Sequence, residues 1–335
     1  MQIDDNRLTE IMRGFDKKKA LVIGDLCLDE YIYGTANSLS PEAPIPRVVI
    51  DSRKYVPGAA GNVACSLSAL GAQTTAFGIL GSDEYGMILL RELKKRGISA
   101  PEILDSSRHT PTYSRVVVGN STRRQQLVRF DLENNREISE DTITKILGYI
   151  EENKKDFDAV IFADYDEIGN GLARPSLISR LAEISDFYGN VLVGISRKRI
   201  NQLRNFSLLI ANEREARQAT GLELRTEPIQ KIGEMLARHT GTNIVITRGE
   251  EGLSVFDKNI DDVYDIPSFA RSVIDVTGAG DSLTATMALS LASGSSLSEA
   301  AYLGSYAAAV AVGKEGTATV TREEIARAIN EKYGK

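Results

Sequence analysis

The chain has 335 residues, of which 42% are hydrophobic and 26% are charged. This composition is ordinary for a globular protein, and the length allows one large α/β domain or two smaller ones. The net charge of −6 argues against a nucleic-acid partner held by bulk charge. We find no signal peptide in the first twenty residues and no apolar run that could span a bilayer, so we expect a cytoplasmic protein without a membrane partner.

Short β-branched runs alternate with helical patterns along most of the chain. The predicted strands cover residues 20–24, 159–163, 191–195, 208–211 and 243–247. Their near-continuous hydrophobicity is typical of a parallel sheet that is covered on both faces. Helical spacing between the strands, as in residues 176–188 and 227–239, indicates βαβ units and therefore a doubly wound α/β fold.

Two stretches depart from this alternation. Residues 31–55 are proline-rich and end in a strand-like run, and residues 110–131 contain two alternating runs, 112–118 and 125–131. The Gly-Asn-Ser sequence between these runs predicts a β-hairpin. We expect both stretches to form a small β-sheet lid on a single domain over residues 1–335, although ordinary edge strands of the main sheet are the alternative.

The run from Asp275 to Asp281, DVTGAGD, precedes a long stretch of small and apolar residues that predicts a helix. A helix N-terminus presents free N–H groups and the positive end of the helix dipole. Because Gly278, Ala279 and Gly280 leave room for an anion, this loop is a candidate phosphate cradle. Asp281 would lie in the first helical turn as a stabilised carboxylate; a plain capping aspartate after a glycine turn is the alternative.

A second glycine-containing stretch, PGAAGN at residues 57–62, opens another predicted helix. Gly58 would let a ligand approach the backbone closely, and Asn62 offers both a donor and an acceptor to a hydroxylated ligand. Glycines at such positions also serve tight contacts between a helix and a sheet, so this stretch alone indicates little.

Polar residues follow two of the predicted strands directly. In open α/β sheets, ligands bind at the carboxyl ends of strands. Asn212 and Glu215 are three residues apart, and such oxygen ligands suit Mg²⁺ directly or through water. Solvated charges at the start of a helix are the alternative. The run from Thr247 to Gly252, TRGEEG, is a candidate nucleotide-facing loop, although by itself it is only a turn.

In combination, PGAAGN and DVTGAGD resemble the two signatures of the PfkB/ribokinase family of carbohydrate kinases, and Asn212 with Glu215 is similar to that family's magnesium-associated motif. The resemblance runs from about residue 20 to the end. It implies a ribokinase-like, doubly wound, mostly parallel sheet with helices on both faces and a small β-sheet lid. It also implies ATP-dependent phosphoryl transfer to a hydroxyl of a sugar or sugar phosphate, with ATP and Mg²⁺ as cofactors. One departure is Thr286, where the family more often has Ala or Gly.

The resemblance further implies roles for individual residues. Asp281 would be the base that takes the proton from the sugar hydroxyl, with Gly278, Ala279 and Gly280 forming the anion hole for the transferred group. The implied sugar contacts are Asp25, Asp29, Gly58, Asn62, Arg124 and Asp164. The implied nucleotide contacts are Asn212, Thr247, Gly249 and Gly252. Glu215 would organise Mg²⁺ through water, and a monovalent cation such as K⁺ would lie beside Asp275, Thr277 and Gly316.

Within the family, the chain is most similar to the kinase domain of bacterial heptose 7-phosphate kinases, which implies a D-glycero-β-D-manno-heptose 7-phosphate substrate phosphorylated at O1. The resemblance rests on GDLCLDEYIYG at 24–34, SPEAPIP at 40–46, RQQLVRFD at 124–131 and VGKEGTAT at 312–319. The chain has no GxxxxGK[ST] stretch, so a P-loop kinase is not expected.

Three substrate loops depart from that subfamily. Ser114-Arg115 stands where a Thr-Lys pair is usual, residues 164–169 lack the Gly/Ala-Lys-Gly run, and residues 194–197 lack Asp-Pro-Lys-Gly. Lys and Arg are not equivalent at phosphate-binding positions. The cations that would hold a substrate phosphate instead are Arg115, Arg123, Arg124, Arg197 and Lys198.

These departures leave alternatives open. The chain would then be a kinase for another sugar or a nucleoside, or a sugar- or nucleotide-binding regulator that has lost catalysis. For its assembly, exposed edges of the lid strands predict a homodimer through the lid, since unpaired strand edges seek partners.

Overall fold

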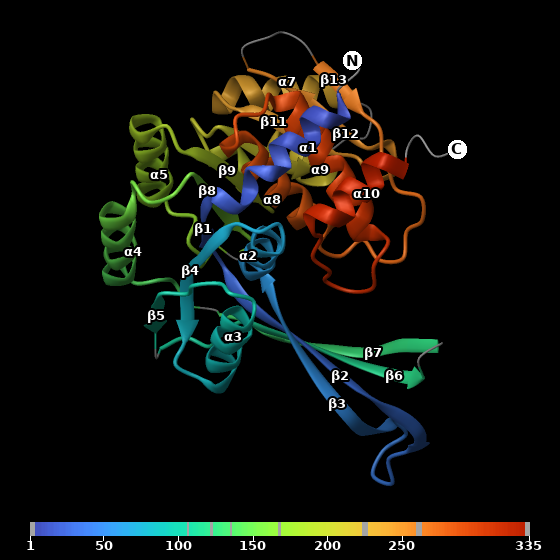
Figure 1. The fold of residues 1–335 in the computed structure, drawn as a ribbon. Coiled ribbons are helices and arrows are strands. Elements are labelled where there is room, and N and C mark those ends of the chain that lie inside the picture. The colour runs from blue at the N-terminus through green and yellow to red at the C-terminus, as the bar shows by residue number, and fades with distance from the viewer. Residues whose placement is uncertain are drawn as a thin grey trace.

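Two β-sheets organise the chain (Figure 1). The structure, a computed structural model, describes residues 4–105, 107–120, 123–134, 136–166, 169–222, 227–258 and 263–331. The nine-stranded large sheet has the order β13-β12-β11-β10-β9-β8-β1-β4-β5, and the four-stranded small sheet has the order β3-β2-β6-β7. Among the described residues, no helix has both the length and the apolar character needed to cross a bilayer.

The large sheet is mostly parallel. Its strands are β1 (Lys19–Gly24), β4 (Gln73–Gly81), β5 (Glu102–Asp105), β8 (Ala159–Asp164), β9 (Val191–Ser196), β10 (Leu208–Asn212), β11 (Asn243–Thr247), β12 (Leu253–Phe256) and β13 (Val263–Ile266). Only β12 and β13 pair antiparallel with their neighbours among these strands. In β1, every residue after Lys19 is buried, which requires cover on both faces.

Helices supply that cover, and the side chains of β1 alternate between two cores. Ala20 and Val22 join the core built with α1 (Asp5–Arg13), α2 (Ala60–Ala69), α3 (Glu84–Lys95), α8 (Ala279–Ala292), α9 (Leu297–Val312) and α10 (Arg322–Glu331). Leu21 and Ile23 join the core built with α4 (Glu140–Asn153), α5 (Pro175–Tyr188), α6 (Glu213–Ala219) and α7 (Ile229–Thr240). Short 3-10 turns cover Phe15–Lys17, Ile200–Gln202 and Gly249–Glu251. The expected doubly wound fold with helices on both faces is confirmed.

The helix predicted after DVTGAGD is α8, and it is buried on all sides from Ser282 to Ser290. A helix whose residues are small and apolar all round is typical of a core position rather than of a surface. Its neighbour α9 packs closely because Gly304 has no side chain: a Cβ there would lie 2.8 Å from Met287. The central position of α8 holds its N-terminus rigidly in the body of the fold.

The small sheet projects from the body as a long arm (Figure 1). It consists of β2 (Leu26–Leu39), β3 (Pro46–Ala59), β6 (Thr112–Asn120) and β7 (Arg123–Leu132). The predicted hairpin of residues 112–118 and 125–131 is β6 and β7, which pair antiparallel; Ser121 of its turn lies outside the described residues. Because these strands pair within a sheet of their own, the alternative of edge strands on the main sheet is wrong.

The boundary predicted for the first lid segment needs correction. We expected residues 31–55, whereas β2 begins at Leu26 and β3 ends at Ala59. The base of β2 is buried on both faces from Leu26 to Glu30, so it lacks the alternation of apolar and polar residues that reveals a surface strand.

Candidate active site

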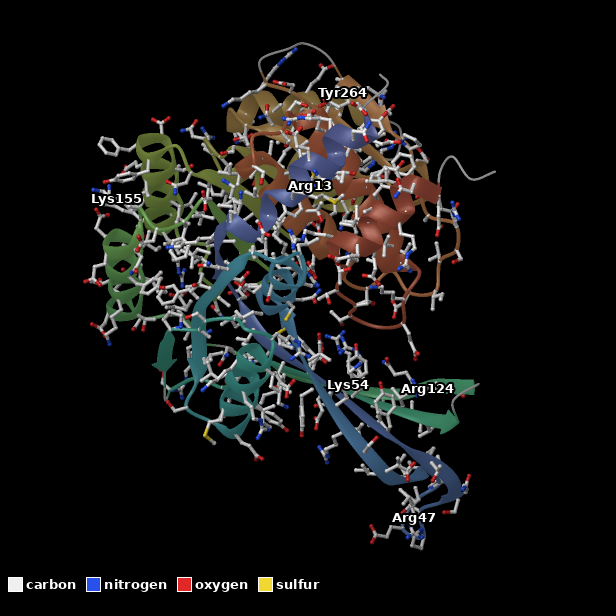
Figure 2. The ribbon with its side chains drawn as sticks, in the orientation of Figure 1. Arg13, Arg47, Lys54, Arg124, Lys155 and Tyr264 are labelled. Atoms are coloured by element: carbon white, nitrogen blue, oxygen red, sulfur yellow. The ribbon has the colours of Figure 1, made fainter. Side chains whose placement is uncertain are left out.

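The predicted site residues converge where the small sheet meets the body. Parallel strands of the large sheet end there, and α8 packs against β8 and β9. Tyr165, directly after β8, contacts Asp281 in the first turn of α8. Figure 2 shows Arg124 of β7 on the side of the small sheet that faces the body. Ligand sites of open α/β sheets form at this edge, because the strand ends leave their loops free to supply polar groups.

Asp281 lies in the first turn of α8, and each of its carboxylate oxygens accepts a hydrogen bond. Tyr165 donates its hydroxyl to Oδ1, and Asn62 donates its side-chain amide to Oδ2. Burial raises the pKa of Asp281, while these two hydrogen bonds and the charge of Arg197 oppose the rise. The arrangement holds a carboxylate of increased basicity in one orientation, as a general base requires.

The residues before Asp281 form a cradle of backbone. Gly278 has the left-handed conformation, with φ of +83°, and α8 begins at Ala279 and Gly280 without a side-chain cap among the described residues. A Cβ on Gly278 would lie 3.1 Å from the amide nitrogen of Asn62, so a side chain would close the cradle. Uncapped N–H groups and the helix dipole therefore face this space, which fits an anion.

Asn62 is 2% exposed and lies in the first turn of α2. Its Nδ2 atom bonds to Asp281, but its Oδ1 atom is buried and has no hydrogen-bond partner among the described residues. Buried polar atoms are normally paired, so this acceptor needs a donor that the described residues do not supply. A ligand hydroxyl beside Asp281 would satisfy it.

Gly58 and Asp29 lie in contact on neighbouring strands of the small sheet. A Cβ on Gly58 would lie 2.7 Å from Oδ2 of Asp29, so glycine is required for this approach. The other oxygen of Asp29 accepts a hydrogen bond of 2.7 Å from Arg115. Arg115 is therefore already engaged with a carboxylate at the base of the small sheet.

Two of the expected sugar contacts have their carboxylates occupied by the protein. Asp25 accepts the backbone N–H groups of Tyr165 at 2.9 Å and Asp166 at 3.0 Å. Burial and the nearby carboxylates of Asp164 and Asp166 raise the pKa of Asp25 to about 7. Asp164 has a fully buried side chain that accepts hydrogen bonds from Ser196 and from Arg199 at 2.6 Å. Sugar contacts by Asp25 and Asp164 stay predictions, and the structure gives both residues a role in holding loops.

Arg124 reaches from the small sheet to the body. Its guanidinium donates to Glu315, in the loop after α9, at 2.9 Å, and it lies 5.0 Å from the ring centroid of Tyr33. Both members of the ion pair are well exposed, so the pair contributes little to stability and can be broken at little cost in free energy. Arg124 could therefore release Glu315 to bind a substrate, and this role stays a prediction.

The residues expected around Mg²⁺ form the start of a helix. Asn212 and Glu215 make a capping box on α6, in which each side chain accepts the other residue's backbone N–H. Asn212 also pairs with Thr247 in the register of β10 and β11, so the two predicted strand-end sites are adjacent. Burial raises the pKa of Glu215, and the hydrogen bonds from Asn212 oppose this. The capping role and the metal role are compatible, because a carboxylate has lone pairs for both.

The turn after Thr247 has a structural reason for its glycines. Gly249 and Gly252 have positive φ values of +60° and +85°. A Cβ on Gly252 would lie 2.1 Å from the carbonyl oxygen of Ile266, so no other residue fits. Nucleotide contacts at this turn stay predictions, since the fold alone accounts for Gly252.

The expected monovalent-cation residues are brought together by hydrogen bonds. Asp275 accepts the backbone N–H of Thr277 at 2.9 Å, its hydroxyl at 2.7 Å and the N–H of Gly316 at 3.0 Å. Burial tends to raise the pKa of Asp275, but the effect of these hydrogen bonds is larger, so its pKa is lowered. An ionised carboxylate beside the anion cradle fits a bound cation.

Sequence reasoning missed Tyr165, Ser196 and Arg199 as parts of the site. Tyr165 directly follows a buried strand at the carboxyl edge, which is a position that could have marked it. Ser196 lies within the 194–197 stretch that departs from the subfamily, and Arg199 lies two residues beyond that stretch. Their role became visible only through their contacts with Asp164.

Comparison with known proteins decides the family. The profile of the pfkB family carbohydrate kinases matches residues 17–324. The chain belongs to this family. Two relatives, each called bifunctional protein HldE, are 38% identical: one from Geobacter metallireducens over 91% of the chain and one from Geobacter sulfurreducens over 94%. The chain spans 62% of the length of the first relative and 64% of the length of the second.

Solved structures support the same fold. Phosphofructokinase-2 from Escherichia coli in complex with potassium has a TM-score of 0.74 at 17% identity, over 94% of the chain and 99% of that structure. A ribokinase from Arabidopsis thaliana complexed with ribose and ATP has a TM-score of 0.68 at 19% identity, over 93% and 98%. The ribokinase-like fold that the signatures implied for this pfkB kinase is therefore confirmed.

Proposed function

We propose that this chain acts as one kinase domain that transfers a phosphoryl group from ATP to a hydroxyl of a sugar phosphate in the cytoplasm. The observation that carries the proposal is Asp281, held by two donors at the open N-terminus of α8. Phosphoryl transfer needs positioning, charge neutralisation and a base for the acceptor hydroxyl, and these residues can supply all three.

The residues present fit the cofactors. Bound ATP would supply the phosphoryl group, and Mg²⁺ would neutralise its charge. Glu215 and Asn212 would orient water molecules around Mg²⁺; the described residues contain no cluster of three or more His, Cys, Asp or Glu that could hold a metal by themselves. The ionised Asp275, with Thr277 and Gly316, would hold K⁺ beside the cradle.

In this mechanism, Asp281 would take the proton of the sugar hydroxyl while the sugar oxygen forms a bond to the γ-phosphorus, the bond from that phosphorus to the bridging oxygen breaks, and ADP leaves. Asn62 Oδ1, which lacks a donor in the described residues, would accept from a neighbouring sugar hydroxyl and fix the ring. The N–H of Ala279 already donates to the carbonyl of Val276, so the N–H groups of Gly280 and Asp281 would stabilise the charge on the transferred group, an effect worth about 10²–10³-fold for each donor.

We propose heptose 7-phosphate, phosphorylated at O1, as the first candidate substrate. The support is the SPEAPIP and RQQLVRFD stretches and the two HldE relatives at 38% identity. On the small sheet, Arg115 is paired with the buried Asp29, whereas Arg124 is paired with the exposed Glu315. Because Arg124 can leave an exposed ion pair at little cost in free energy, it is our candidate for holding the substrate phosphate.

The test is ADP release with Mg²⁺-ATP across a panel of sugars, sugar phosphates and nucleosides, heptose 7-phosphate included. We expect turnover on heptose 7-phosphate and a large increase in its KM for Arg124→Met. Turnover on another panel member alone would support the kinase activity and exclude heptose 7-phosphate as the substrate. Binding of ATP without turnover on any member would favour a regulator that has lost catalysis.

We also propose a homodimer formed through the small sheet. Val128 and Phe130 are two residues apart on β7, so they share a face, and they are 41% and 58% exposed. Ile50 on β3 is 50% exposed, and Arg47 lies near the far end of the arm (Figure 2). Large apolar side chains on a projecting sheet fit a self-complementary interface.

We expect a dimer at micromolar concentration by size-exclusion chromatography with light scattering, and a monomer for the Val128→Asp/Phe130→Asp variant. The matched control is Phe187→Asp on α5, which changes an even more exposed phenylalanine outside the small sheet and should leave the dimer intact. A monomeric wild-type protein would exclude this interface.

A further inference from the structure

We propose that Tyr165 is a positioning residue for Asp281, and that Arg197 holds the Tyr165 ring in place. The inference rests on the proposed kinase function and deepens it. The hydroxyl of Tyr165 donates to Oδ1 of Asp281, so it fixes the carboxylate oxygen that Asn62 does not reach.

The backbone of Tyr165 is held independently of Asp281. Asp25 accepts the N–H groups of Tyr165 and Asp166 through the same oxygen. Arg199 donates to the carbonyl and the carboxylate of Asp166, and it also pairs with Asp164 just before Tyr165. These contacts fix the loop on both sides of Tyr165, so the phenol is placed before any ligand arrives.

The ring of Tyr165 is held by a cation from the next strand. Arg197 follows β9, and its backbone N–H donates to the carbonyl of Asp164 at 3.2 Å. Its guanidinium carbon lies 5.4 Å from the centroid of the Tyr165 ring, within the range of a cation–π contact. The charge of Arg197 also favours the anionic form of Asp281, whereas the nearby Asp29 disfavours it.

Tyr165 can support Asp281 in both of its protonation states. The amide nitrogen of Asn62 can only donate, but a phenol can donate or accept. When Asp281 takes the sugar proton it becomes a carboxylic acid, and the Tyr165 hydroxyl can rotate to accept from it. Burial and the Asp281 charge raise the pKa of the Tyr165 phenol well above its usual range, so the phenol keeps its own proton throughout.

The test compares Tyr165→Phe with wild type on a substrate that the panel identifies. We expect kcat to fall about 10- to 100-fold, since a hydrogen bond to a charged group is lost. The KM for ATP should change by less than about 2-fold, because Tyr165 is not among the proposed nucleotide contacts. The acid limb of kcat/KM should move to higher pH, since a contact that lowers the pKa of Asp281 is removed.

A second variant and a control separate positioning from folding. Arg197→Met should lower kcat by about 3- to 10-fold and move the acid limb in the same direction. The control is Tyr188→Phe on α5, where the tyrosine ring lies near Lys154 and Lys155. This variant should leave kcat and the acid limb unchanged.

An unchanged kcat and an unchanged acid limb for Tyr165→Phe would overturn the inference. So would a fall in its melting temperature with loss of ATP binding, because Tyr165 would then serve the fold alone. A wild-type protein inactive on the whole panel would instead overturn the proposed function, which keeps the two failures distinct.

Discussion

Asp281→Asn is expected to lower kcat by about 10²- to 10⁴-fold, the contribution of a general base. The variant should keep the shape of the site, since an asparagine can accept from Asn62 with its oxygen and donate to the Tyr165 hydroxyl with its nitrogen. The affinity for Mg²⁺-ATP, measured by titration calorimetry, should stay close to that of wild type.

The control for this variant is Asp4→Asn. Asp4 also lies at a helix N-terminus, where its side chain caps α1 by accepting the N–H of Asn6. Asparagine caps helices nearly as well as aspartate, so activity should be unaffected. If Asp281→Asn retained near-normal turnover, Asp281 could not be the base and the proposed mechanism would be wrong.

Arg199→Met is expected to lower the free energy of unfolding by about 3–5 kcal/mol, because it leaves the buried Asp164 carboxylate without its cation. The side chain of Asp164 is 0% exposed and that of Arg199 is 15% exposed. Arg199 makes hydrogen bonds of 2.6 Å and 3.1 Å to the two oxygens of Asp164. Urea denaturation at neutral pH measures the loss directly.

Two further variants isolate the cause. Arg180→Met removes an arginine of α5 that pairs with Glu151 and Glu183 at the surface, and it should leave the free energy of unfolding almost unchanged. Asp164→Asn/Arg199→Met removes both charges and should recover part of the stability. A cost for Arg199→Met as small as that of Arg180→Met would show that Asp164 finds other compensation.

The parts of the site that could be predicted from the sequence are those encoded by short contiguous stretches of the chain. The loop from Asp275 to Asp281 and the helix after it were predictable because a glycine-rich turn and a long run of small residues are contiguous in the chain. The strand ends at Asn212 and Thr247 were predictable because a parallel sheet places its carboxyl ends on one edge.

The parts that were missed depend on contacts between distant residues. Tyr165 meets Asp281 across 116 positions, and Asp25 binds the N–H of Tyr165 across 140. Nothing in either neighbourhood indicates these pairings. The base of β2 was missed for another reason, since burial on both faces from Leu26 onward removes the two-residue period of an exposed strand.

Asp25 is the one residue between the end of β1 at Gly24, in the large sheet, and the start of β2 at Leu26, in the small sheet. Its carboxylate holds the loop of Tyr165, and its backbone bonds to Ala163 in β8 and to Ala60 in α2. The residue that joins the arm to the body is therefore also the residue that aligns the support of the base. Because Tyr165 already holds Asp281 without a ligand, any movement of the arm would bring the sugar to a base that is already oriented, so closure would not have to reorganise the base.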